Sequence, residues 1–129
     1  MTDAPTADPA ALKAVAERYA EVASGRDVEA YVDLFAEDAV IVDPVGTPPH
    51  VGRQAVRAFR QSAVDAVSSM DFTIHGTRAA GDHVAFNFVV EATVGGAKMH
   101  IEGIETFQIE GGKIKTMTAV WSEADATFG

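Results

Sequence analysis

The sequence predicts a single α+β domain, with three helices followed by a meander of long antiparallel strands that curves around an apolar pocket. Apolar residues in the first half recur at helical spacing, whereas those in the second half alternate with polar ones. Glycine pairs at 95–96 and 111–112 separate the alternating runs, as hairpin turns do. No linker or repeat divides the 129 residues, so we expect one domain over 1–129 with a flexible tail at 1–7.

Three helices are predicted before the sheet, over residues 9–25, 27–35 and 52–68. Asp8 and Asp27 are good N-caps, and Gly25 marks the end of the first helix. The inward-facing residues are Leu12, Val15, Ala16, Tyr19 and Ala23 in the first helix, Val28, Tyr31, Val32 and Phe35 in the second, and Val56, Phe59, Ala63 and Val67 in the third. Tyr19 on this stripe fits either a core aromatic residue or a phenol donor that points into a cavity.

The predicted strands are recognised mainly by the two-residue period of a half-buried strand. They cover 39–42, 70–75, 83–94, 97–109 and 117–121, with turns at 43–46 and 79–82 and a loop at 47–51. On the fourth strand Glu105 is in register with the apolar Ile101 and Phe107. A carboxyl group on that face loses hydration unless it is paired or protonated, so Glu105, with a raised pKa, is a functional-site candidate. A register slip or β-bulge is the alternative, and it would return Glu105 to water.

A second carboxyl group stands at the end of the first strand, in the stretch AVIVDPVG at 39–46. The β-branched run favours a strand, and Pro44 restricts Asp43 to extended backbone. Gly46 then allows the chain to turn. Asp43 therefore fits a general base held on backbone with little freedom beside apolar surface, or simply a turn residue.

Composition argues against several classes of function. The net charge of −9 disfavours nucleic acid and anionic membrane surfaces as partners. No apolar run is long enough to span a membrane, no signal peptide is recognisable, and there are no cysteines, which fits a cytoplasmic protein. The four histidines lack metal-ligand spacing, so no metal site is predicted.

Several segments give the chain a resemblance to a known family. These are RY at 18–19, LFAEDAVIVDPVG at 34–46, GRQAVRAF at 52–59, VAFNFVV at 84–90, and the closing Met117 and Trp121. Over nearly its whole length the chain resembles the bacterial Δ5-3-ketosteroid isomerases (steroid delta-isomerases), within the superfamily of cone-shaped nuclear transport factor 2-like domains. The resemblance implies a steroid substrate, no cofactor, and a homodimer.

The same resemblance implies roles for three residues. Asp43 takes the position of the family's general base, and Tyr19 that of its oxyanion-hole tyrosine. Glu105 takes the position of the second oxyanion donor, an aspartic acid in the family, which an apolar site keeps neutral so that it can donate a hydrogen bond. The expected substrate-binding residues are Phe59, Phe86, Phe88, Met99, Met117 and Trp121.

Two departures from the family pattern are visible. Glu105 is one methylene longer than the family's aspartic acid. In addition, some members support the catalytic tyrosine with further tyrosines from the second and third helices, and those positions correspond here to Phe35 and Arg60. Tyr19 is therefore expected to lack a tyrosine relay, with Arg60 placing a cation near the site.

Three alternatives to a steroid isomerase remain open on the sequence. One is another enzyme of the same fold, such as an epoxide hydrolase, a cyclase or a dehydratase. The second is a non-catalytic binder of steroid-like or polyketide-like ligands, and the third is a dimerisation module. The orientations of Tyr19, Asp43 and Glu105 bear on these alternatives. If all three point into one cavity, the isomerase is favoured over the dimerisation module, whereas a Glu105 that faces water or is ionised would favour the binder.

Overall fold

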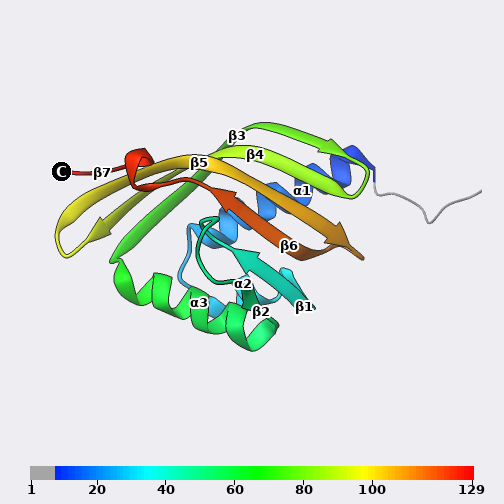
Figure 1. Cartoon of the computed structure of the whole chain (residues 1–129), viewed down its shortest axis with the longest axis horizontal. Coiled ribbons are helices and arrows are strands. Elements are labelled where there is room, and N and C mark those ends of the chain that lie inside the picture. Colours follow the sequence, from blue (N-terminus) through cyan, green and yellow to red (C-terminus); the bar gives the residue numbers. More distant parts are fainter. Residues whose placement is uncertain (1–7) are drawn as a thin grey trace, which may run out of the picture.

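The computed structural model describes residues 8–129, so the predicted tail at 1–7 lies outside the described residues. Three helices and a curved sheet form one α+β unit (Figure 1). The elements are α1 (Pro9–Ala23), α2 (Val28–Val32), β1 (Phe35–Val42), β2 (His50–Val51), α3 (Arg53–Ala66), β3 (Ser69–Ala80), β4 (His83–Val94), β5 (Ala97–Glu110), β6 (Lys113–Val120), a 3₁₀ turn η1 (Glu123–Asp125) and β7 (Ala126–Phe128). The predicted fold class is confirmed.

The three helices begin close to the predicted positions, although the side chain of Asp8 makes no capping hydrogen bond. Pro9 occupies the first turn of α1, and the side chain of Asp27 accepts a hydrogen bond from the Ala30 amide at the start of α2. The buried face of α1, which includes Leu12 and Tyr19, packs against β3. In Figure 1, α1 runs along the sheet, α3 lies below it, and the sheet curves over the helices.

The sheet has the strand order β2-β1-β6-β5-β4-β3, with β7 pairing β5 beyond the end of β6. The strands β3 to β6 form the predicted antiparallel meander. The pairing of β1 with β6 is parallel, which corrects the expectation of a wholly antiparallel sheet. A parallel pair is possible because the chain between these two strands is long enough to cross from one end of the sheet to the other.

Several element bounds differ from the predicted ones. The second helix ends at Val32, and the first strand begins at Phe35, where it pairs with Ile114 of β6. The strand predicted at 70–75 continues to Ala80 past an irregularity between His75 and Arg78. The short strands β2 and β7 were not predicted, because their few residues show no period of their own. Long-range pairing therefore sets these bounds.

The core lies between the inner face of the sheet and the helices. Aromatic rings fill much of it: Tyr19 packs edge-on against Phe107 and Phe72, and Phe107 packs edge-on against Phe86. These contacts hold α1 on the middle of the sheet. Within residues 8–129 no helix has the length and apolar character needed to span a membrane.

Gly103 of β5 pairs with Phe88 of β4, and the Phe88 ring occupies the space that a side chain at position 103 would need. A Cβ atom at Gly103 would come within 2.7 Å of two ring carbons of Phe88 and 2.8 Å of the carbonyl oxygen of Val120. We therefore expect Gly103→Ala to lower the free energy of unfolding by about 2 kcal/mol, because the backbone carbonyl cannot easily yield. Urea denaturation tests this. Gly25→Ala is the matched control, because its Cβ would meet only one ordinary contact, at 3.5 Å.

Candidate active site

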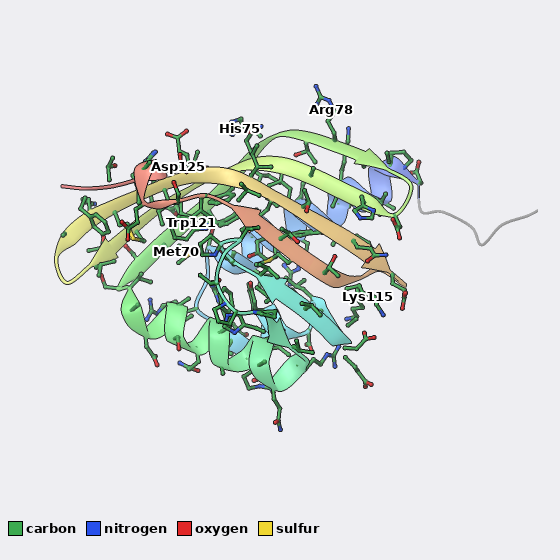
Figure 2. All side chains as sticks on the ribbon, in the orientation of Figure 1. Met70, His75, Arg78, Lys115, Trp121 and Asp125 are labelled. Carbon is green, nitrogen blue, oxygen red and sulfur yellow. The ribbon has the colours of Figure 1, made fainter. Side chains whose placement is uncertain are left out.

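A cavity of about 220 Å³ lies between the inner face of the sheet and the helices. Tyr19, Asp43 and Glu105 all line it, although they come from α1, the loop after β1, and β5. Of the residues expected to bind substrate, Phe59, Phe88, Met99 and Trp121 line the cavity. In Figure 2, Trp121 and Met70 lie between the sheet and α3, whereas His75 and Arg78 project from the outer side.

Phe86 and Met117, also expected to bind substrate, are not among the lining residues. Their side chains are on the inner face, as their strands' period predicts, but they are buried in the core, with 2% and 0% of their surface exposed. Phe86 packs against Phe107, and Met117 lies beside Phe107 in the β5–β6 register. Both side chains are therefore core residues that do not reach the cavity.

Glu105 points inward, without a register slip. It pairs with Phe86 of β4 and Ala119 of β6, and only 2% of its surface is exposed. Its Oε1 atom has no hydrogen-bond partner among the described residues. Burial, and to a lesser degree the negative charge of Asp43, raise the pKa of Glu105 well above its usual range. A neutral carboxylic acid with a free polar atom can donate a hydrogen bond into the cavity.

Asp43 is placed in a different environment, at the rim of the sheet. Its Oδ1 atom accepts a hydrogen bond of 2.8 Å from the indole nitrogen of Trp121. Nearby, the amide of Val45 donates to the carbonyl of Ala119, which fixes the loop to β6. Burial raises the pKa of Asp43, while the Trp121 hydrogen bond and the charge of His50 oppose that rise. Asp43 is thus the more readily ionised of the two acids.

The hydroxyl of Tyr19 is not isolated. It lies 3.1 Å from the hydroxyl of Tyr31, and both phenols are almost completely buried. The expectation that Tyr19 lacks a tyrosine relay is therefore wrong, because the partner comes from Tyr31 and not from the position of Phe35. Phe35 instead packs against the ring of Tyr31 at 5.1 Å. Burial raises the pKa of Tyr19 well above its usual range, so its proton stays available for donation.

Arg60 also lines the cavity, with only 4% of its surface exposed. Its Nη2 atom donates to the carbonyls of Ala23 and Gly25, at 2.9 and 2.8 Å. The guanidinium carbon is 4.7 Å from the centre of the Tyr31 ring. The expected cation is thus near the site, but it contacts Tyr31 and the end of α1 and makes no hydrogen bond to either acid.

The residues can together carry out proton transfer beside an oxygen that gains negative charge. Asp43 can accept a proton, while Tyr19 and neutral Glu105 can donate hydrogen bonds from within the same cavity. Within the described chain, His, Asp and Glu residues do not form a group of three that could hold a metal ion. Sequence reasoning missed Tyr31, although its position on the inward face of α2 was recognisable, and it missed the donor role of Trp121.

Glu105→Gln should remove a pH dependence of stability. Because the folded-state pKa of Glu105 is raised, its contribution to stability is complete below the unfolded pKa and is lost as the pH rises through the folded value. Relative to Glu105→Gln, the wild type should therefore lose stability from about pH 4 upward. Urea denaturation of both proteins across this range measures the difference. A constant difference would show that Glu105 titrates normally.

Trp121→Phe should raise the pKa of Asp43 further, because the indole donor stabilises the ionised carboxylate. Carboxyl-carbon NMR titration of the labelled protein measures this, with Asp43→Asn assigning the resonance. Met99→Leu is the control, because Met99 lines the cavity without being one of the groups that shift the pKa of Asp43. An equal shift in both variants would contradict the role given to the indole.

The chain is similar in sequence to two enzymes. The chain is 32% identical to the steroid Delta-isomerase of Nocardioides simplex over 117 residues, which cover 90% of this chain and 94% of that protein. A shorter stretch of 46 residues, 36% of this chain, is 46% identical to the epoxide hydrolase LasB of Streptomyces lasalocidi and covers 16% of its length.

Solved structures show the same fold. The epoxide hydrolase/cyclase-like enzyme SalBIII, described in pyran ring formation in the polyether salinomycin, superposes with a TM-score of 0.85 at 28% identity, covering 92% of this chain and 95% of that one. Rv0760c of Mycobacterium tuberculosis has the same TM-score at 24% identity, covering 95% and 99%, and shows the fold alone. Residues 16–117 match the SnoaL-like domain. The chain therefore belongs to the SnoaL-like family of nuclear transport factor 2-like domains.

Proposed function

We propose that this protein is a steroid Δ5-isomerase, which moves the double bond of a 3-oxo-Δ5-steroid into conjugation with the ketone. The observation that carries the proposal is the presence of two acids in unlike environments in one cavity. Asp43 accepts a hydrogen bond from Trp121, whereas Glu105 is buried with an unpartnered oxygen. Such a pair favours one ionised base and one neutral donor. The identity with a steroid Delta-isomerase over most of both chains supports the same reaction.

Proton abstraction is the first step. The steroid's A-ring enters the apolar cavity, with its C3 oxygen toward Tyr19 and Glu105. The Asp43 carboxylate takes a proton from C4, and the electron pair of that C–H bond moves into the ring, so that the C3 oxygen becomes a dienolate oxygen. The ketone itself accepts the electrons, so the step needs no cofactor.

Two hydrogen-bond donors, Tyr19 and Glu105, stabilise the dienolate. Tyr19 and neutral Glu105 each donate a hydrogen bond to the C3 oxygen, in a cavity where the low dielectric strengthens both bonds. Asp43 then returns its proton to C6, and the electrons shift to give the Δ4 enone. The net reaction is an intramolecular proton transfer that leaves Asp43 and Glu105 in their original charge states.

A second candidate is an epoxide-opening cyclase. The matches to LasB and to SalBIII favour it. In that reaction Asp43 would take the proton of a substrate hydroxyl, whose oxygen attacks an epoxide carbon. The epoxide C–O bond would break as Glu105 gives its proton to the departing oxygen. Both acids serve this chemistry, but Tyr19 has no necessary part in it.

Asp43→Asn should abolish most of the activity on 5-androstene-3,17-dione. We expect turnover to fall by about a thousandfold, because the amide cannot accept the C4 proton. The appearance of enone absorbance measures the rate. Glu105→Leu should cost less than Asp43→Asn, because Tyr19 remains as a donor.

Tyr19→Phe separates the two candidates. It should lower isomerisation by about a hundredfold through the loss of one oxyanion donor, but should spare the cyclisation of a 4,5-epoxy-1-alkanol by an epoxide-opening enzyme. Cyclisation without isomerisation would replace the isomerase proposal by the cyclase. If the steroid quenches the fluorescence of Trp121 but neither reaction occurs, the protein is a binder and both enzymatic proposals fail.

A further inference from the structure

Arg60 is a buried cation that the proposed reaction steps do not use. The carbonyls of Ala23 and Gly25 accept hydrogen bonds from the same Nη2 atom, and they therefore fix the guanidinium at the C-terminal end of α1. Its Nε atom has no hydrogen-bond partner among the described residues. Among the residues that line the cavity, within the part of the chain described, Arg60 is the one arginine or lysine.

The fixed charge faces one member of the tyrosine pair. The guanidinium carbon lies 4.7 Å from the centre of the Tyr31 ring, a distance at which a cation interacts with the ring face. This charge opposes the rise that burial causes in the pKa of Tyr31. The negative charge of Asp43 raises the pKa of the same phenol, as the charge of Glu105 would if that acid were ionised. Arg60 therefore makes the hydroxyl of Tyr31 a better donor than it would be without the cation.

We propose that Arg60 is a positioning residue that acts through Tyr31, which donates to Tyr19 and so leaves the Tyr19 proton free for an oxygen in the cavity. The hydroxyl–hydroxyl distance of 3.1 Å accommodates this direction of donation. Negative charge that develops on a ligand oxygen is then shared along Tyr19 and Tyr31 toward the guanidinium. This inference rests on the oxyanion site of the proposed function.

The arrangement defines a class of ligand. A cation behind two phenols contributes little to a neutral ketone but more to an enolate or phenolate, whose oxygen carries the charge. The cavity should therefore bind a phenol in a more ionised form than water does at the same pH. The ionisation of a bound phenol does not depend on catalysis, so it can be measured without turnover.

A bound naphthol tests the inference. The ionised fraction of 2-naphthol bound to the wild-type protein is followed by absorbance across a pH series, with quenching of Trp121 fluorescence reporting occupancy. Arg60→Met should raise the apparent pKa of the bound naphthol by about one unit, a tenfold loss in its ionisation constant. Tyr31→Phe should raise it as well. In the Tyr31→Phe background, Arg60→Met should have little further effect, because the connection to Tyr19 is already lost.

Arg26→Met is the matched control for a purely structural role. Arg26 donates to the carbonyls of Val64 and Val67 at the end of α3, much as Arg60 does at the end of α1, but it does not line the cavity. We expect Arg26→Met to lower stability and to leave the naphthol pKa unchanged.

Three results would overturn the inference: no ionisation shift in Tyr31→Phe, full additivity of the two substitutions, or no binding of naphthol by the wild type. If Arg60→Met does not fold, the absence of an ionisation shift in Tyr31→Phe still overturns the inference. If the steroid is not isomerised but the naphthol pKa follows Arg60 and Tyr31, only the choice of reaction fails.

Discussion

The burial of Glu105 in an apolar cavity is the constraint on which the proposed site depends. An unpaired carboxylate there would cost several kcal/mol in lost hydration, so burial favours the neutral acid. Arg60 lines the same cavity and would ionise Glu105 if the two formed a salt bridge. The carbonyls of Ala23 and Gly25 hold the guanidinium elsewhere. The hydrogen bonds at the end of α1 therefore keep this cation from pairing with Glu105, while burial favours the neutral acid.

The difference between the two acids follows from where the sheet places them. Glu105 is in the middle of β5, between β4 and β6, where neighbouring strands occupy the backbone donors. Asp43 follows the last residue of β1, where the chain leaves the sheet and Trp121 follows the parallel strand β6. The parallel pairing brings both of these ends to the same edge, and the indole can then reach the carboxylate. One topology thus gives two carboxyl groups unlike environments, as the proposed base and the proposed acid require.

Much of this could be predicted from local patterns. The two-residue period of β5 placed Glu105 on the inner face, and helical spacing placed Tyr19 on the buried face of α1. Periodicity identifies a face but not the depth at which a residue lies, which is why Phe86 was expected in the cavity and is instead packed in the core. The hydroxyl contact of Tyr31 depends on how α2 packs against α1, and no local pattern records that. The parallel β1–β6 pair is a long-range contact of the same kind.

The tyrosine pair helps to distinguish the two reactions that this cavity could support. Epoxide opening requires an acid that transfers its proton completely, and additional donors behind it contribute little to that transfer. Enolisation leaves negative charge on one oxygen, so stabilisation grows with each donor and with any cation aligned behind them. The hydroxyl oxygens of Tyr31 and Tyr19 are 3.1 Å apart, and the guanidinium carbon of Arg60 is 4.7 Å from the centre of the Tyr31 ring. All three side chains are buried. Such an arrangement stabilises an anion, and it therefore favours isomerisation through a dienolate over the opening of an epoxide.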